Sequence, residues 1–337
     1  MKQRTMWGIY HHNMPECIRT LATAPALQRL KEVGMHCGCE YTSFPMFAGL
    51  EPYSRFDHSV GCALIVWHFT HDVRQTTAAL LHDIATPTFA HVIDFLNGDH
   101  IKQESTERGT ADIIQHSAEL MATLNNLGLT LQEVVDYHQY PIADNDSPRL
   151  SADRLEYTLS NLIHYHIATS HEVKHWYESL IVGQNEDGQP ELMFADLPTA
   201  EAFSLAALHT SRIYIADEDR YAMQTLAELL KRHIGRGILT RNDLYQTEHH
   251  VINLLSQDAE AKQDWQLYRS LSRIYKGNVR LHVENSPFQE GKIILSKRRH
   301  INPYVQDQGR TTTLSPTFST ALTQFLAIPL DEPLWGE

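Results

Sequence analysis

Apolar residues recur every three or four positions along much of this 337-residue chain, the spacing of a helix with one buried face. The pattern predicts helices over 15–33 (two short ones, divided at Pro25), 58–73, 75–85, 89–96, 103–121, 131–138 and 149–168. Further helical patterns cover 199–233, 241–256 and 258–275. Between Gly277 and Ser296, Val279, Leu281 and Val283 alternate with other residues, which predicts a small antiparallel hairpin. We therefore expect an all-α (mainly α) protein.

A hydrophilic stretch over 184–190 indicates a boundary between two parts of the chain. We expect a helical core over 15–182, a helical extension over 199–276, a small β element over 277–304 and a tail over 305–337. The tail is rich in Thr, Ser and Gln, which predicts poor packing.

Composition narrows the class of protein. The formal net charge of -13 argues against general nucleic-acid binding, which needs a surplus of Lys and Arg, so any phosphate recognition should be local. The four cysteines lack a CxxC pair. They are interpreted as buried free thiols in a reducing compartment, with a soft-metal site at Cys37 and Cys39 as the alternative. An apolar run long enough to cross a membrane and a secretory signal are not apparent, so we expect a cytoplasmic protein.

The dipeptide His82-Asp83 follows two leucines and so carries two metal-ligand side chains into a buried helix end. The chain offers its own comparison at His71-Asp72, where the same pair has polar neighbours and predicts a solvated helix terminus. Adjacent residues point in different directions on an ideal helix, so both can ligate only where the helix ends. Pro87 provides such an end.

Two further residues complete a predicted ligand set, because His58 precedes this pair in the chain and Asp153 follows it. Two imidazoles and two carboxylates suit one divalent cation, with coordination positions left for water and a phosphate oxygen. Each residue also has an ordinary structural interpretation, His58 as a polar helix start and Asp153 as a solvated carboxylate. The combination and order of the four favour the metal site.

Other polar residues near these ligands have the chemistry of phosphate hydrolysis. His91 and Asp94 lie three apart, so the carboxylate can fix the tautomer of the imidazole. Arg55 can hold a phosphate oxygen, with Arg154 or Tyr157 as helpers. The alternatives are a surface ion pair of Arg55 with Asp57 or Glu51, and a core imidazole at His91 bonded to backbone.

The segments Arg55-Phe56-Asp57-His58-Ser59, His82-Asp83 and Asp153-Arg154-Leu155-Glu156-Tyr157 resemble the HD-domain metal-dependent phosphohydrolases, and most nearly the deoxynucleoside triphosphate triphosphohydrolases. The resemblance covers residues 15–170. It implies an HD-domain helical bundle and one divalent metal ion (Mn, Fe, Mg, Co, Ni or Zn) on His58, His82, Asp83 and Asp153. It also implies a phosphate contact at Arg55, a catalytic His91 with Asp94, and sugar contacts at Glu32 and Asn161, where the family has a glutamine and an aspartate.

This chain departs from that family at Thr86 and Gln103, where the relatives carry histidines that hold or process the triphosphate. We expect a phosphohydrolase that cleaves a phosphate ester or anhydride of a nucleotide-type substrate, including a deoxynucleoside triphosphate. The alternative is a nucleotide-binding sensor or assembly protein without turnover. A third hypothesis is oxidative chemistry at a two-iron centre. Family members commonly assemble, so a homo-oligomer is expected.

Two further clusters remain outside this site. His171 and His175 have zinc-compatible spacing, so a second metal is an alternative to plain surface histidines. The basic run Lys297-Arg298-Arg299-His300 is interpreted as a solvated strand end, with a phosphate or partner contact as the alternative.

Overall fold

The computed structural model describes residues 4–98, 109–277 and 291–337, and within them the protein is mainly α, as the periodicity predicts. Sixteen α-helices and two small sheets lie in these ranges. The predicted hairpin strand at 279–283 and the residues 103–108 of the predicted helix 103–121, Gln103 included, lie outside the described residues.

The first helix of the chain was not predicted, and the other helices before the candidate site follow the predicted pattern to within four residues at each end. In chain order, with the first included, these helices are α1 (Arg4–Tyr10), α2 (Glu16–Leu21), α3 (Pro25–Arg29), α4 (Arg55–Thr70), α5 (Val73–Leu81) and α6 (Val92–Asn97). Pro25 is the first residue of α3, where its missing N–H costs nothing, so the division into two short helices is confirmed.

The helix α4 is the centre of the first hydrophobic cluster and packs against α1, α5 and α9 (Ala152–His164). Eleven of its sixteen residues are buried. A Cβ at Gly61 would lie 2.6 Å from the Glu156 side chain, so the glycine permits the close approach of α9. This approach brings residues about one hundred positions apart into contact.

Polar residues shift three predicted helix boundaries. Ser117 ends α7 (Thr110–His116) and caps α8 (Ala118–Asn126), so the predicted helix 103–121 is interrupted. Over 131–138 the structure has two short 3-10 turns, because the Asp136 carboxylate accepts the His138 N–H and competes with a continuous helix. The predicted helix 149–168 begins after its cap, Ser151, and spans the shorter α9.

A second hydrophobic cluster joins residues from 37–47 and 89–96 to the later helices α12 (Asp217–Gly235), α13 (Glu248–Gln257) and α14 (Ala259–Ser270). In particular, α6 packs against α12. The segment predicted as one core, 15–182, therefore contributes to both clusters.

The hydrophilic stretch over 184–190 is the turn of a hairpin, where a plain boundary loop was expected. Strands β1 (Leu180–Gln184) and β2 (Pro190–Phe194) are antiparallel, with Leu180 opposite Phe194. The chain returns beside β2 as β4 (Tyr304–Val305) and turns into β5 (Gly309–Arg310), which gives the order β1-β2-β4-β5. A separate pair joins β3 (Ile274–Lys276) to β6 (Leu334–Gly336).

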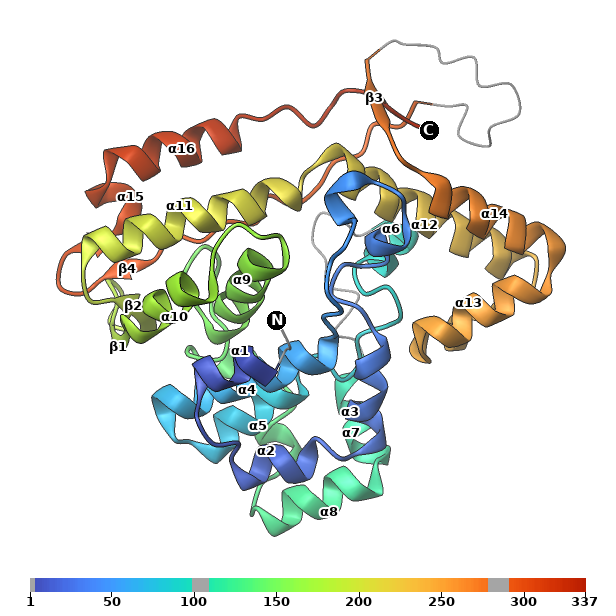
Figure 1. The fold of residues 1–337 in the computed structure, drawn as a ribbon. Helices are drawn as coiled ribbons and strands as arrows, with labels where there is room; N and C mark the ends of the chain where they lie inside the picture. Colours follow the sequence, from blue (N-terminus) through green and yellow to red (C-terminus); the bar gives the residue numbers. More distant parts are fainter. Residues whose placement is uncertain (1–3, 99–108, 278–290) are drawn as a thin grey trace.

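The tail is well packed, which corrects the expectation from its composition. Helices α15 (Thr311–Leu314) and α16 (Pro316–Leu326) lie along α11 (Leu197–Ile213), as Figure 1 shows. Phe318, Leu322 and Phe325 are buried in a third cluster, and Ser315 caps α16. The polar residues of the tail thus include a helix cap, while its few large apolar residues form the contact.

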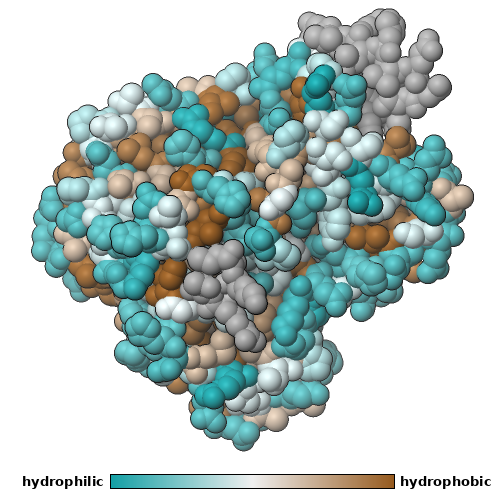
Figure 2. Space-filling view, in the orientation of Figure 1, coloured by the Kyte–Doolittle hydropathy of each residue, from teal (hydrophilic) through white to brown (hydrophobic). Residues whose placement is uncertain are grey.

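Hydrophilic residues cover much of the face in Figure 2, with apolar patches between them. Within the described ranges, every helix is too short or too polar to cross a membrane.

Candidate functional site

The first turn of α4 presents Arg55 and His58 to the site. Ser54 and Asp57 form a reciprocal capping box, in which the Ser54 hydroxyl accepts from the Asp57 N–H at 3.2 Å and the Asp57 carboxylate accepts from the Ser54 N–H at 3.1 Å. Asp57 is thereby engaged at the cap. The Arg55 guanidinium instead donates to Asp83 at 3.0 Å, and the ion pair with Asp57 or Glu51 considered above is not the one the described residues form.

The helix α5 ends at Leu81, one residue before His82-Asp83, so the two side chains leave a helix end and reach one place. His82 Nε2 lies 3.6 Å from Asp83 Oδ2 and 3.6 Å from Asp153 Oδ1. The matched dipeptide behaves differently: His71 is the exposed, left-handed C-cap of α4, and Asp72 caps α5. The contrast predicted between the two dipeptides is confirmed.

His58 closes the group, with its Nε2 atom 2.9 Å from Asp153 Oδ1 and 4.0 Å from Asp83 Oδ2. Two donor atoms that each lie about 2.1 Å from one ion, at an angle near 90 to 110°, are roughly 3.0 to 3.4 Å apart. The separations in this group are therefore close to those of ligands on a single cation.

The second nitrogen of each imidazole is held from behind, which turns Nε2 toward the group. His58 Nδ1 lies 2.6 Å from Glu156 Oε2, and His82 Nδ1 lies 2.7 Å from the Ala79 carbonyl oxygen. With Nδ1 engaged by these acceptors, Nε2 is the nitrogen of each ring that can bind a metal. The donor set and its supports fit a divalent ion.

The two carboxylates at the site are held in the charged form. Burial raises the pKa of Asp83, but Arg55, His82 and His58 outweigh it and hold that pKa well below its usual range. Burial also raises the pKa of Asp153, and the hydrogen bond and charge of His58 outweigh it in the same way. The Thr86 hydroxyl donates to Asp83 Oδ1 at 2.6 Å and fixes the carboxylate further. Charged carboxylates are the form that binds a cation.

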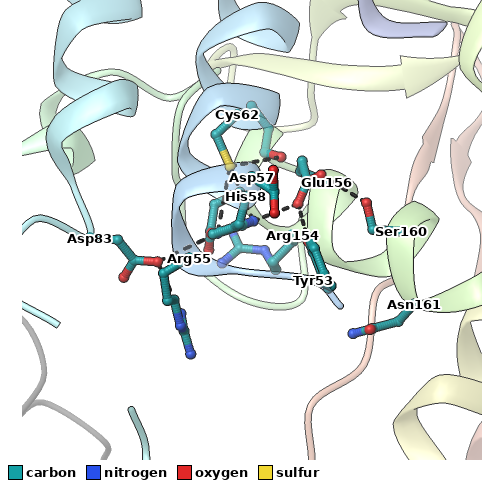
Figure 3. Close-up of polar contacts among 12 residues, drawn as sticks. Tyr53, Arg55, Asp57, His58, Cys62, Asp83, Arg154, Glu156, Ser160 and Asn161 are labelled. Carbon is teal, nitrogen blue, oxygen red and sulfur yellow. Dashed lines mark hydrogen bonds and ion pairs between the residues drawn. The ribbon is translucent and has the colours of Figure 1, made fainter. Parts of the chain in front are cut away.

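Glu156 belongs to the segment Asp153-Arg154-Leu155-Glu156-Tyr157, but no role for it was predicted from the sequence. Its side chain is fully buried and accepts hydrogen bonds from His58, Tyr53, Tyr10 and Ser160, as Figure 3 shows for the first, second and fourth. The signal was its position three residues after Asp153, which places both on nearby parts of α9. A buried carboxylate with four partners holds His58 rigidly.

Cys62 also lies against the group, one helical turn after His58. Its sulfur is 3.6 Å from both ring nitrogens of His58, and its position with His58, His82 and Asp153 satisfies the spacing of a metal site. Burial raises the pKa of the thiol. The cysteines are all free and buried, as predicted.

His91 lines the same cleft as the ligand group and pairs with Asp94 as predicted. Its Nδ1 lies 2.9 Å from Asp94 Oδ2, and its Nε2 lies 3.5 Å from an Arg299 nitrogen. The side chain is 23% exposed and lines the cleft, so it is no core imidazole. Burial lowers the pKa of His91, and the charges of Arg299 and Arg55 lower it further against the effect of Asp94. The imidazole is neutral near pH 7, with a lone pair on Nε2.

These groups open into one cleft of about 260 Å³. Three buried polar atoms of its wall, His36 Nε2, Arg55 Nε and Asn161 Oδ1, have no hydrogen-bond partner among the described residues. Such atoms are costly unless a ligand or water satisfies them. The wall also contains Tyr137, His138, Tyr157, Tyr165, Tyr214 and Asp219, most of which sequence reasoning missed because they lie far apart in the chain.

The structure brings some predicted substrate contacts to the cleft and leaves others elsewhere. Tyr157 and Asn161 line the cleft, and the Asn161 amide donates to the Tyr214 hydroxyl at 2.7 Å. Glu32 is exposed and is not among the lining residues. Arg154 lines the cleft, but its guanidinium is bound to Asp144 at 3.0 Å and to the Asn145 and Arg149 carbonyl oxygens.

The two other predicted clusters lie in different surroundings, one exposed and one partly in the cleft. His171 and His175 are exposed on α10 (Ser170–Glu178), and neither belongs to the convergent ligand group found among the described residues. The basic run was interpreted as a solvated strand end, but Lys297 and Arg299 line the cleft. The chain folds back after the helical extension, which its local composition does not reveal.

Comparisons with known proteins agree with this geometry. No family model matches the sequence. The chain is 26% identical over 328 residues to the metal-dependent phosphohydrolase cns2 of Cordyceps militaris, covering 93% of this chain and 88% of that protein. It is 25% identical over 227 residues to the uncharacterized protein YdhJ of Bacillus subtilis, a match that spans 66% of each protein, just under two thirds of that relative's length.

Two solved structures share the fold. One is a hypothetical protein from Aquifex aeolicus, with a TM-score of 0.65 and 16% identity over 96% of this chain and 92% of that one. The other is a phosphohydrolase from Bacteroides thetaiotaomicron, with a TM-score of 0.58 and 14% identity over 96% of both chains. At these identities the two solved structures show a shared fold.

Proposed function

We propose that this protein is a metal-dependent phosphohydrolase that cleaves a phosphate ester or anhydride of a nucleotide-type substrate. The observation that carries the proposal is the convergence of His58, His82 and Asp153, whose ligand atoms lie within 4.8 Å of one another. Asp83 Oδ2 lies 3.6 Å from His82 Nε2 and 4.0 Å from His58 Nε2, and the Arg55 guanidinium donates to the same carboxylate. The full-length likeness to a protein named as a metal-dependent phosphohydrolase supports it.

His58, His82, Asp83 and Asp153 are the residues that would hold the divalent ion. Such an ion supplies Lewis acidity toward a phosphoryl oxygen and lowers the pKa of a bound water. Arg55 places a positive charge beside the ligand group and neutralises a phosphoryl oxygen there. His91 accepts a proton at Nε2 and returns it to the leaving oxygen, while Asp94 holds Nδ1 and stabilises the protonated ring.

The cleft favours a compact polar substrate. Its volume of about 260 Å³ is at the small end for small-molecule sites, which are roughly 300 to 1,000 Å³. Thr86, which replaces a triphosphate-handling histidine of the resembling family, is committed to Asp83. The unpartnered acceptor of Asn161 and the tyrosine hydroxyls suit the hydroxyl groups of a sugar. We infer that substrates with one or few phosphates are preferred over triphosphates.

A substrate panel and a metal measurement test the proposal. Purified protein is incubated with nucleoside mono-, di- and triphosphates and Mn, Mg, Co or Ni, and the products are separated by chromatography. We expect phosphate release, close to one transition metal per chain, and loss of both in Asp83→Ala because a ligand is removed. Asp72→Ala, the same change in the matched His-Asp dipeptide, should keep both. Metal content unchanged by Asp83→Ala would refute the site, and binding without turnover across the panel would favour a sensor.

A further inference from the structure

The described segment that begins at Gly291 starts beside β6, where Lys292 pairs with Leu334, and leads to β4 (Figure 1). Ser296, Lys297 and Arg299 line the cleft. Arg298, between them, turns the other way, and its guanidinium donates to the Ile328 carbonyl oxygen. Of the three consecutive cations in this segment, Lys297 and Arg299 therefore face the cleft, and Arg298 faces the packed tail.

Arg299 lies beside the histidine to which we assign proton transfer. Its guanidinium is 3.5 Å from His91 Nε2, the atom assigned to proton transfer. Its charge acts on Tyr157 of α9 and on Tyr214 as well as on His91. Arg55 acts on the same imidazole from the ligand side. The charges of both guanidiniums therefore act on His91.

Two further cations line the cleft, and each pairs with a carboxylate. Arg55 pairs with Asp83 and Arg154 pairs with Asp144, each at 3.0 Å. The protein as a whole carries a formal charge of -13, which repels an anionic substrate at long range. Lys297 and Arg299 add local positive charge to the wall of the cleft, and Arg299 places that charge beside His91.

We propose that Lys297 and Arg299 form a phosphate-binding subsite that grips the phosphoryl group of the substrate from the His91 side of the cleft, facing Arg55. This inference rests on the proposed function. When phosphate binds, the Arg299 N–H moves from His91 Nε2 to a phosphoryl oxygen, and the Nε2 lone pair becomes available to accept a proton. A planar guanidinium suits this role because it binds two phosphate oxygens at once.

Three variants test the subsite against a matched control. Arg299→Gln and Lys297→Gln remove a cleft-facing cation, and Arg298→Gln removes the cation that faces the tail. With the best substrate of the panel, we expect KM to rise about 10- to 100-fold in Arg299→Gln and less in Lys297→Gln, in line with a lost charge-assisted phosphate contact. Arg298→Gln should leave KM within about two-fold. Arg299→Lys should recover only part of the affinity.

A second measurement does not depend on turnover. Inorganic phosphate is titrated calorimetrically into the metal-loaded protein and each variant, and circular dichroism melts confirm that each variant is folded. Phosphate binding weakened by Arg299→Gln but not by Arg298→Gln supports the subsite, even if no substrate of the panel is hydrolysed. Equal phosphate affinity in the wild-type and Arg299→Gln proteins would overturn it, and so would equal losses in Arg299→Gln and Arg298→Gln. Hydrolysis with an unchanged KM in Arg299→Gln would also overturn the subsite while leaving the phosphohydrolase intact.

Discussion

Each imidazole of the candidate metal centre has one nitrogen for the ion and one for the protein. A backbone carbonyl holds His82, whereas a fully buried carboxylate, Glu156, holds His58. A carboxylate behind an imidazole makes the ligand more basic as well as better oriented. The strength of metal binding should therefore depend on a residue that does not touch the ion.

The substitution Glu156→Gln tests this dependence. The amide keeps the size of the side chain but cannot accept from His58, Tyr53 and Ser160 together, so we expect metal affinity to fall about 10- to 100-fold. Competition with a chelator of known affinity measures the change. Ser160→Ala removes another partner of the same carboxylate and should have a much smaller effect. Unaltered affinity in Glu156→Gln would show that His58 is oriented without it.

At the scale of elements, the starts of α4 and α6 and the end of α5 determine where the chemistry lies. His58 and Arg55 occupy the first turn of α4, His82-Asp83 follows the last residue of α5, and His91 precedes α6. Helix ends allow neighbouring residues to converge, which a helix interior does not. The capping box of α4 should therefore affect activity as well as stability.

Ser54→Ala removes that cap. We expect the free energy of unfolding to fall by about 1 kcal/mol, within a range of about 0.5 to 2 kcal/mol, because the Asp57 N–H loses its acceptor. We also expect lower turnover, because the turn that carries Arg55 and His58 loosens. Thr169→Ala, at the capping box of α10, should cost similar stability and leave turnover unchanged. Urea unfolding and steady-state kinetics measure the two effects, and an equal loss of turnover in both variants would contradict the prediction.

At the scale of the whole molecule, the cleft lies where the two large hydrophobic clusters meet. His58 and His82 extend from elements of the first cluster, while Cys37 and Met223 belong to the second. On α12, Asp219 lines the same cleft, and burial raises its pKa to about 7. A carboxyl that stays protonated in the folded protein links global stability to pH.

The sign of this link follows from the two pKa values. In the unfolded chain Asp219 has a pKa near 3.8, so the folded state binds more protons between about pH 4 and pH 7, and stability falls as pH rises through that window. Asp219→Asn removes the penalty. The variant should gain on the order of 1 kcal/mol relative to the wild type at pH 8, and little at pH 4. The exposed Asp307→Asn is the control, and urea unfolding at both pH values decides. A pH-independent difference between wild type and Asp219→Asn would contradict the buried protonated carboxyl.

Much of the fold and the ligand set could be predicted because their signals are local. Helical periodicity predicted α2, α3, α4 and α5, and the neighbours of His82-Asp83 distinguished it from His71-Asp72. Side chains that compete with the helix for backbone N–H groups are harder to predict, so a helix was expected where the structure has 3-10 turns over 131–139. The composition of the tail predicted poor packing, which was wrong. Three of its large apolar residues pack against α11, although many of its residues are polar.

The sequence by itself determined the helical class, the helix ends at which the site is built and the chemistry of the residues that could meet there, because these depend on neighbours within a few positions. Only the tertiary structure decided which distant side chains do meet. It placed Glu156 behind His58, engaged Arg154 with Asp144, left Glu32 outside and brought Arg299 to His91. Those contacts depend on the packing of whole elements, which a linear pattern does not encode.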